Sequence, residues 1–316
     1  MCEITVVIPT FNRAHLVERA IESALRQTLQ PSQVVVVDDG STDGTAEVCA
    51  NYSKSIEYVR QSNQGVSAAR NCGIRLARYP WTAFLDSDDY WTPTYLEKMN
   101  SAIIGTSGSA RFYFSDIGFP PSSPFTSLWI SLRFQLPGPF LLKPDGSEWM
   151  LCRRQPCPLP ASVFNTQMLK MCGGFDVRFP ILEDTELFCR LGIGGSICAV
   201  NTLGCQETAD DELKNRLTGQ MHSRTAAYWE RECMLSCSLL SRFSGLKPRL
   251  KRAIRFNLAA AYWRLSRLHL QSGRIFPFAM ELARSWTSEP AFMFWLLRKG
   301  STNGWETTVL PRCEAR

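Results

Sequence analysis

The sequence predicts an α/β protein with a mostly parallel sheet flanked by helices and a helical appendage at its C-terminal end. Short apolar segments rich in β-branched residues alternate with amphipathic, helix-length segments over residues 4–104. The strand segments are apolar on both faces, and the pattern becomes continuously helical after Leu213. Strands that are buried on both faces and separated by helices are typical of parallel sheets covered on both sides.

The expected elements follow one another at short intervals. ITVVIP is bounded by Pro9 and predicts the first strand, and Asn12 is expected to cap a helix that runs to Pro31. The next segments predict, in order, a strand over 33–38, a helix over 45–52, a strand over 56–60, a helix over 66–76, a strand over 81–86 and a helix that begins near Pro93.

Residues 105–160 are rich in Pro, Gly, Ser and aromatics, and they predict mainly loops that form a variable wall of a site. A strand over 110–116 and a short helix over 127–135 are expected within them. The C-terminal segments AIRFNLAAAYWRLSRLHLQSG and PFAMELARSW predict a helical hairpin that turns at Gly273. We therefore expect a first domain over 1–212, with halves of about 1–104 and 105–212, and a helical region over 213–316.

The charge is unevenly distributed between these two regions. Residues 1–212 carry 17 Lys+Arg and 23 Asp+Glu, whereas residues 213–316 carry 18 and 6. A basic region favours an anionic surface, which is either phospholipid or nucleic acid. No nucleic-acid-binding module accompanies the charge, so we expect no nucleic acid partner. RLKRAIRFN predicts either core packing or a basic amphipathic face, with Lys247, Arg249, Lys251 and Arg252 on an anionic membrane surface.

The N-terminal sequence MCEITVVIPTFNR lacks the pattern of a secretory signal, and no segment has the roughly 20 apolar residues of a membrane span. We therefore expect a cytoplasmic protein, with peripheral attachment to the inner face of the membrane as an option. The 12 cysteines show no metal-ligand spacing and are expected to be reduced.

Polar side chains follow three of the predicted strands directly. PTFN follows the first strand, DDGST the second, and DSDD the strand WTAFL. The carboxyl ends of parallel strands lie at one edge of a sheet, and ligands bind there in open α/β folds. The sequence therefore places a binding site at this edge.

Asp86, Asp88 and Asp89 lie within four consecutive positions, which crowds like charges together. A divalent cation relieves this crowding, because Mg²⁺ or Mn²⁺ prefers oxygen ligands from one or two carboxylates and a substrate phosphate. The alternative is an acidic loop that caps the helix near Pro93. A phosphatase-type aspartate nucleophile in VVVVDDGST is disfavoured. That chemistry needs two acids separated by one residue, and Asp38 and Asp39 are adjacent.

Five motifs occur in a characteristic order: VVIPTFNR, VVVVDDGSTDGT, NQGVSAARNCGI, FLDSDD and GGFDVRF…EDTELFCRL. Together they resemble glycosyltransferase family 2, and the resemblance covers about residues 3–192. It implies the GT-A fold, which is Rossmann-like, together with a nucleotide-sugar donor, a divalent metal (Mn²⁺ or Mg²⁺), and transfer with inversion at the anomeric carbon.

The resemblance also implies roles for particular residues. Asp39 accepts a hydrogen bond from the nucleobase, Pro9, Thr10 and Asn12 complete the nucleoside site, and Arg70 lies near the diphosphate. Asp86 contacts the ribose or a metal-bound water, and Asp88 ligates the metal, with Asp89 in a secondary role. Asp184 is the catalytic base and Glu183 orients the acceptor. Gly173 and Gly174 form a tight turn into the acceptor site.

We expect an enzyme that moves a sugar from a nucleoside-diphosphate donor, with uridine or thymidine as the base, to a hydroxyl group of a saccharide or lipid-linked acceptor. The expected setting is the biosynthesis of polysaccharide or another glycoconjugate. One alternative is a catalytically silent relative that binds nucleotide or glycan as an assembly partner. A nucleotidyltransferase is a further alternative, although PTFNRAH is not a Gly-rich phosphate loop. His222 is the only histidine near the end of the resemblance, and it is a weaker candidate ligand.

Overall fold

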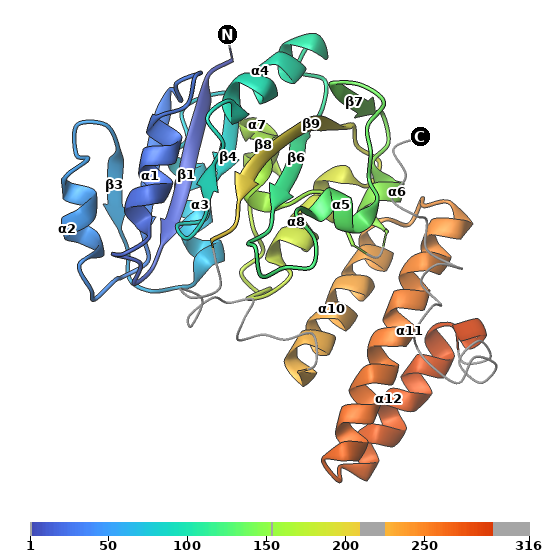
Figure 1. Cartoon of the computed structure of the whole chain (residues 1–316). Helices are drawn as coiled ribbons and strands as arrows, with labels where there is room; N and C mark the ends of the chain where they lie inside the picture. Colours follow the sequence, from blue (N-terminus) through green and yellow to red (C-terminus); the bar gives the residue numbers. More distant parts are fainter. Residues whose placement is uncertain (1, 153, 209–224, 293–316) are drawn as a thin grey trace. The chain divides into compact units, whose positions relative to one another are not determined.

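The computed structural model describes residues 2–152, 154–208 and 225–292, which form two compact units (Figure 1). The first unit contains residues 2–150 and 154–208, and the second contains the helices of residues 225–292 together with Leu151 and Cys152. The domain boundary expected after residue 212 and the candidate ligand His222 both lie outside the described residues.

The first unit is built on a mixed sheet of nine strands in its described part. Four parallel strands form one half, in the order β3 (Glu57–Arg60), β2 (Gln33–Asp38), β1 (Ile4–Thr10) and β4 (Trp81–Phe84). The antiparallel β8 (Ser162–Asn165) then joins β4 to β6 (Phe112–Gly118), and β9 (Ile197–Gln206) runs parallel to β6. β5 (Tyr90–Trp91) and β7 (Phe140–Lys143) pair antiparallel with β9.

Helices cover this sheet because the side chains of each strand alternate between its two faces. Val6 and Val34 pack in one core cluster with α1 (Val17–Leu25) and α4 (Tyr95–Gly105). Val35 and Val37 point the other way, toward α3 (Val66–Leu76). The remaining helices of this unit are α2 (Thr45–Ala50), α5 (Leu128–Leu132), α6 (Ser147–Met150), α7 (Thr166–Met171) and α8 (Glu183–Gly192), with a 3₁₀ turn over Leu159–Ala161.

Asn12 does not cap the first helix, and this prediction was wrong. α1 begins at Val17, five residues later, and Asn12 adopts the left-handed conformation with φ 52°. Its backbone N–H donates to Ser41 Oγ at 2.9 Å, and its Oδ1 accepts from the backbone N–H of Thr42 at 2.8 Å. Asn tolerates a positive φ and forms local side-chain hydrogen bonds. Asn12 therefore joins the loop after β1 to the loop after β2.

The second unit contains three helices in its described residues: α10 (Ala226–Arg242), α11 (Pro248–Gln271) and α12 (Ile275–Ser288). The turn between α11 and α12 has Gly273 at φ 71°, with the Arg274 N–H donating to the His269 carbonyl at 2.9 Å. This is the αL helix ending that favours glycine, and it confirms the predicted hairpin. Of the helices that the structure describes, none combines the length and apolarity needed to cross a bilayer.

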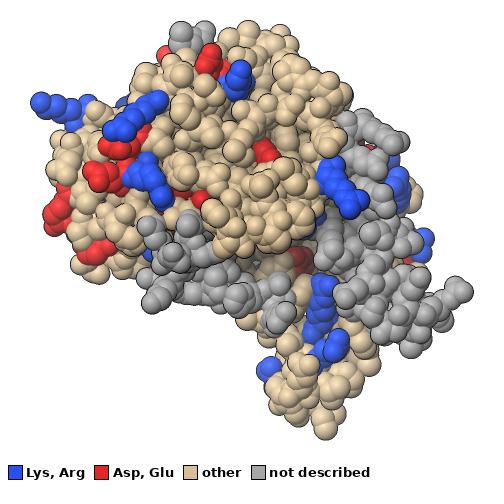
Figure 2. All heavy atoms as spheres, viewed as in Figure 1, with Lys and Arg blue, Asp and Glu red and all other residues tan. Residues whose placement is uncertain are grey.

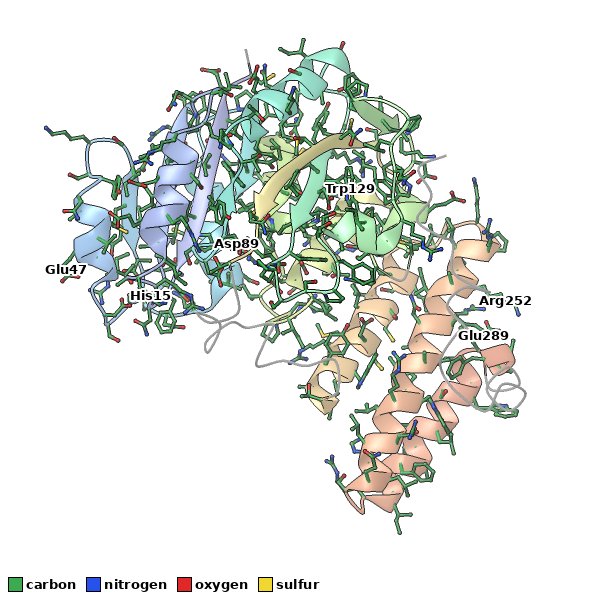
Figure 3. All side chains as sticks on the ribbon, viewed as in Figure 1. His15, Glu47, Asp89, Trp129, Arg252 and Glu289 are labelled. Atoms are coloured by element: carbon green, nitrogen blue, oxygen red, sulfur yellow. The ribbon has the colours of Figure 1, made fainter. Side chains whose placement is uncertain are left out.

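The basic segment RLKRAIRFN forms the first part of α11. Its apolar members Leu250, Ala253, Ile254 and Phe256 are buried within the helical unit. Arg252 lies beside Glu289 on this unit, with Nε–Oε1 at 3.7 Å (Figure 3). The segment therefore exposes its charges, while its apolar side chains form core, as the packing alternative predicted.

Candidate functional site

The three polar clusters do meet at the carboxyl edge of the parallel strands. Thr10 ends β1, Asp39 follows β2 and Asp86 follows β4 by two residues. The Asp39 N–H donates to the Thr10 carbonyl at 2.9 Å, which joins the first two clusters directly. Asp89 lies at the same edge of the sheet (Figure 3). Thr10 is buried, and among the described residues its Oγ1 has no hydrogen-bond partner.

Asp38 and Asp39 are adjacent but have separate surroundings. The Asp39 carboxylate accepts from the N–H groups of Gln64 at 3.0 Å and Gly65 at 2.7 Å, and from Gln61 Nε2 at 2.7 Å. These bonds fix its position at the start of α3.

Asp38 is fully buried and accepts from the Ser41 N–H at 2.7 Å and from the Tyr58 hydroxyl at 2.6 Å. Burial, followed by this bond to Asp38, raises the pKa of Tyr58 well above its usual value. Asp38 is thus a structural acid.

Arg70 joins the two acidic motifs of the edge. Its Nη2 donates to Asp86 Oδ1 at 2.7 Å, and its Nη1 donates to Glu183 Oε1 at 2.8 Å. The Arg70 side chain is 5% exposed, compared with 29% for Asp86 and 14% for Glu183. The ring of Phe175 lies against the guanidinium, 5.3 Å from centroid to Cζ. The bridge brings the segment after β4 and the start of α8 together across nearly a hundred residues of sequence.

Glu183 and Asp184 form the first turn of α8. Leu182, just before them, has φ 64°, and the Asp184 Oδ1 accepts from the Thr185 N–H at 2.6 Å. Burial raises the pKa of Glu183, and the neighbouring charge of Asp184 raises it further, while Arg70 acts in the opposite direction. Asp184 is half-buried beside this pair. An acid at this position can accept a proton from a hydroxyl group that approaches the edge.

A second set of contacts anchors residues 173–175, which precede α8, to α3. Asn71 Nδ2 donates to the Phe175 carbonyl at 2.8 Å, and Asn71 Oδ1 accepts from the Phe175 N–H at 2.7 Å. Gly173 and Gly174 form the expected tight turn, with φ of 84° and 68°. A Cβ on Gly174 would lie 2.2 Å from Asn71 Oδ1, so both the conformation and the space require glycine.

Glu186 does not belong to the edge. It is buried and forms an ion pair with Arg190, which also donates to the carbonyls of Cys172 at 2.6 Å and Gly174 at 2.8 Å. This pair fixes α8 to the glycine turn.

The segment DSDD is held on its other side by Arg19. Arg19 Nη2 donates to the Asp88 carbonyl at 3.2 Å, and the hydroxyl of Thr208 donates to the same carbonyl. The Arg19 guanidinium lies over the ring of Tyr90, 4.9 Å from its centroid. The Asp89 N–H donates to the Asp86 carbonyl at 3.0 Å, which closes the turn.

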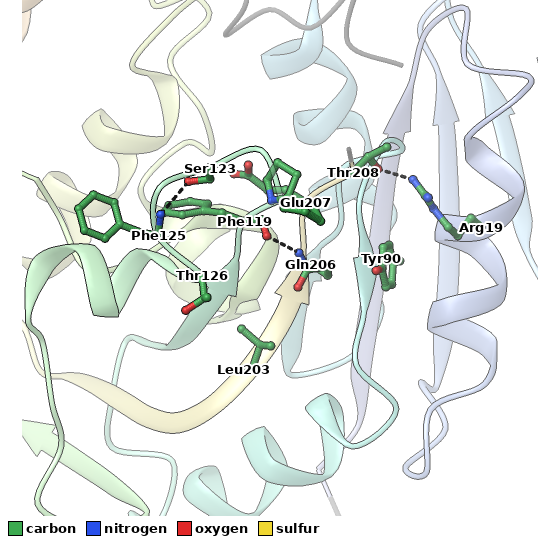
Figure 4. Close-up of a pocket in the computed structure, with 12 residues that line it drawn as sticks. Arg19, Tyr90, Phe119, Ser123, Phe125, Thr126, Leu203, Gln206, Glu207 and Thr208 are labelled. Carbon is green, nitrogen blue, oxygen red and sulfur yellow. Dashed lines mark hydrogen bonds between the residues drawn. The ribbon is translucent and has the colours of Figure 1, made fainter. Parts of the chain in front are cut away.

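A cavity of about 630 Å³ lies next to this turn (Figure 4). Gln206 and Glu207 extend from the end of β9 into its wall, and Gln206 Nε2 donates to the Phe119 carbonyl at 3.0 Å. The lining combines aromatic and polar side chains: Arg19, Tyr90, Phe119, Pro120, Pro121, Ser123, Phe125, Thr126, Leu203, Gln206, Glu207 and Thr208. Residues 119–126 belong to the region that was predicted to form a wall of the site.

Several of these residues were missed by sequence reasoning. Gln61 is one of three amide residues in QSNQG, and Arg19 is a helix arginine; nothing in their local sequence distinguishes them. Asn71 adjoins Arg70 within the motif SAARN, and this proximity was the available signal.

Comparison with known proteins identifies the motif-bearing part of the chain. The model of the family described as glycosyl transferase family 2 matches residues 5–130. Residues 5–130 belong to this family. The match covers the strands β1 to β6, apart from the first residue of β1, and it includes Asp39, Arg70 and Asp86.

Relatives of this glycosyltransferase family 2 domain include the validoxylamine A glucosyltransferase of Streptomyces hygroscopicus subsp. jinggangensis. It is 40% identical over 131 residues, which are 40% of this chain and 31% of that protein. Glycosyltransferase GlyA of Streptococcus pneumoniae is 36% identical over 105 residues, which are 32% of this chain and 15% of that protein. The chain therefore spans less than a third of the length of these two relatives.

The solved structure of S. aureus TarS 1-349 in complex with UDP-GlcNAc superimposes with a TM-score of 0.61 at 14% identity, covering 91% of this chain and 92% of that one. A second solved structure of S. aureus TarS 1-349 superimposes with a TM-score of 0.60 at 14% identity, covering 95% of this chain and 93% of that one. At this identity the likeness concerns the fold. The predicted GT-A architecture with a helical C-terminal region is confirmed.

The acids of this glycosyltransferase family 2 domain fit a divalent cation only together with a substrate. Within residues 2–152, 154–208 and 225–292, no three His, Cys, Asp or Glu side chains come together as a metal site. The Asp86 and Asp88 carboxylates supply the hard oxygen atoms that Mg²⁺ or Mn²⁺ prefers, and phosphate oxygens commonly complete such sites. The residues are thus consistent with a cation shared with a diphosphate.

Proposed function

We propose that this chain is an inverting glycosyltransferase that moves a sugar from a nucleoside-diphosphate donor to a hydroxyl group of a saccharide or lipid-linked acceptor. The observation that carries the proposal is the Arg70 bridge between Asp86 and Glu183, at the strand edge that also holds Asp39. Family membership of residues 5–130 and the UDP-GlcNAc complex of TarS support a uridine diphosphate donor.

Asp39 is proposed to bind the nucleobase. Its carboxylate is fixed by two backbone N–H groups and by Gln61, so that it is preorganised to accept one more hydrogen bond from an imide N–H. Pro9 and Thr10 end β1 and Asn12 lies on the loop that follows, and the buried Thr10 hydroxyl supports a polar ligand there. Asp86 is proposed to contact the ribose or a metal-bound water.

Asp88 is proposed to ligate Mn²⁺ or Mg²⁺ together with the donor diphosphate. When bound, the cation neutralises the negative charge that develops on the leaving diphosphate. Arg70 was expected to bind the diphosphate, but in the structure each of its terminal nitrogens donates to a carboxylate. We therefore assign Arg70 to positioning Asp86 and Glu183.

Asp184 is proposed as the general base. It takes the proton from the acceptor hydroxyl as that oxygen forms a bond to the anomeric carbon, and the bond from this carbon to the diphosphate breaks on the opposite side. The buried Glu183, fixed by Arg70, orients the acceptor. The cavity lined by Tyr90, Phe119 and Gln206 is proposed to bind the acceptor, because aromatic rings with a few polar groups suit sugar rings.

The test measures release of nucleoside diphosphate from UDP-sugars with Mn²⁺, together with UDP affinity. Asp184→Asn is expected to lower turnover by about 10²–10⁴-fold while UDP affinity is unchanged, because only the proton acceptor is lost. Asp88→Ala is expected to lower both.

Asp176→Asn is the matched control, because Asp176 is a nearby acid whose ion pair is with the exposed Arg178. If the wild type binds UDP but turns over none of the donors tested, the alternative of a catalytically silent nucleotide-binding relative would be favoured. A role in polysaccharide or glycoconjugate biosynthesis, at the cytoplasmic side of the cell, is proposed with this activity.

A further inference from the structure

The helical unit presents an exposed apolar end at the turn between α11 and α12. The side chains of Leu270, Ile275 and Phe276 are 51%, 72% and 74% exposed. Within residues 225–292, every large hydrophobic side chain that is exposed lies between Leu270 and Trp286. Scattered exposed apolar residues are ordinary, but several together at the end of a hairpin indicate an interaction surface.

The helix α12 buries two polar side chains and exposes several large apolar ones. Its inward side carries Glu281, which is 8% exposed, and Ser285, whose Oγ donates to the Ala259 carbonyl of α11 at 2.8 Å. Its outward side carries Phe276 and Met280, one helical turn apart. A surface helix normally places its polar side in water. In α12 Leu282 packs in the core as usual, but Phe276 and Met280 are exposed together with Arg284.

The exposed charges between Arg267 and Trp286 are all positive, since the one acid there, Glu281, is buried. Residues 233–280 contain 9 Lys+Arg and no Asp or Glu. Arg267, one turn before the end of α11, and Arg274, at the hairpin turn, are exposed. On the face that Figure 2 shows, the lower end of the helical unit carries no charged side chain, and Lys and Arg lie above it. An apolar end with exposed arginines around it is complementary to a bilayer whose headgroups are anionic.

We infer that the α11–α12 turn is a membrane-insertion element. Leu270, Ile275 and Phe276 enter the interfacial region of an anionic phospholipid bilayer, while Arg267 and Arg274 contact its headgroups. A second copy of the chain is a poorer partner, because pairing two such ends places the exposed arginines of both copies close together and they repel one another.

This position differs from the one predicted from the sequence. The basic residues Lys247, Arg249 and Arg252 lie near the start of α11, about 30 Å along the helix from the turn. Their apolar neighbours in sequence are buried in the bundle. A bilayer that binds at the hairpin turn therefore contacts residues 267–276 before the basic start of α11.

The experiment is flotation of the full chain with vesicles of phosphatidylglycerol and phosphatidylcholine, and with vesicles of phosphatidylcholine alone. We expect partitioning to the anionic vesicles only. Ile275→Ser with Phe276→Ser should lower the partition coefficient at least tenfold, because two exposed apolar side chains no longer enter the bilayer. Arg267→Glu with Arg274→Glu should lower it by a similar factor, and this effect should shrink at high salt.

Two control variants are matched to these. Met171→Ser with Val177→Ser removes apolar side chains that are 73% and 61% exposed in the first unit, and should leave binding unchanged. Arg249→Glu with Arg252→Glu changes the same charge at the far end of α11, and should have the smaller effect. Circular dichroism of each variant checks that the helices are intact.

The inference is overturned by any of three results: no flotation with anionic vesicles, equal loss in the Met171 and Val177 control, or loss with the Arg249 and Arg252 variant alone. It is also overturned if the wild type associates with itself and the serine variants abolish only that association. Transfer activity on a soluble acceptor is not part of this test, so failure here leaves the proposed function intact.

Discussion

Replacing Arg70 with Met tests whether the bridge between the two acidic motifs holds the site together. The substitution keeps most of the apolar stem and removes the guanidinium that donates to Asp86 and Glu183. Glu183 would remain 14% exposed with Asp184 beside it and no cation in contact. Its pKa, already raised by burial, should then rise further.

The expected cost follows from the exposure of the three partners. Removing one member of a fully buried ion pair costs about 3–5 kcal/mol, because the other charge stays buried without compensation. Asp86 is 29% exposed and can be hydrated in part, so its share is small. The contact of the guanidinium with Phe175 contributes about 0.5–1 kcal/mol. We expect a loss of about 3 kcal/mol in the free energy of unfolding at pH 7.

The assay is urea unfolding followed by circular dichroism, with Arg178→Met as the matched control. Arg178 forms an equally short pair with Asp176, but its side chain is 68% exposed, so the control should lose less than about 1 kcal/mol. Because the chain has two units, the transition of the first unit is followed separately by hydrogen exchange of its strands. In the double variant Arg70→Met with Glu183→Gln, at least half of the lost stability should return.

The reasoning is refuted if Arg70→Met and Arg178→Met are equally stable within about 0.5 kcal/mol. It is also refuted if Glu183→Gln restores nothing in the Arg70→Met background, because the cost would then come from packing rather than from an uncompensated carboxylate.

Four further predictions concern other parts of the same unit. Gly73→Ala should cost about 2 kcal/mol, because its Cβ would lie 2.2 Å from Val7 Cγ1, whereas Gly138→Ala, with no atom within 4 Å, should be neutral by thermal unfolding. The stability of Glu183→Gln relative to the wild type should increase as pH rises above about 4.3. The pKa of Glu183 is raised in the folded state, so the wild type loses stability as this carboxyl ionises, and the Gln variant does not. A constant difference in stability between pH 4 and 8 would contradict this. UDP affinity measured by calorimetry should fall at least tenfold when Mn²⁺ is replaced by a chelator, and equal affinity would remove the cation from the proposal. Asp39→Asn should weaken UDP binding, whereas Asp38→Asn should lower stability and leave UDP affinity unchanged, because the buried Asp38 accepts from the half-buried Tyr58 hydroxyl and does not contact the nucleobase site.

Patterns of burial made the sheet and its helices predictable. The helix expected over residues 66–76 has those bounds in the structure, and the expected strands lie within a few residues of β1, β2, β3 and β4. The same strands fix which polar clusters meet, because parallel neighbours end at one edge. Apolar periodicity therefore predicted both the fold and the edge where the acids gather.

Contacts between side chains far apart in sequence were not predictable in this way. Asn12 has the composition of a helix cap, but its hydrogen bonds to Ser41 and Thr42 depend on the loop after β2. Arg70 was expected at the diphosphate because an arginine fork suits phosphate oxygens, and it equally suits the two carboxylates that the fold brings to it. A local pattern gives the chemistry of a donor, and the tertiary fold selects the acceptor.

The helix α3 connects these long-range contacts. Arg70 and Asn71 are consecutive and therefore leave the helix in different directions, one to the acids and one to the Phe175 backbone. On the same face as Arg70, three residues further along, Gly73 allows α3 to pack directly on Val7 of β1. The distance between α3 and β1 therefore determines where Glu183 and Asp184 lie relative to Asp39. This is a physical reason for a glycine far from the acids to matter for the geometry of the site, and it links the packing of the sheet to the proposed proton transfer.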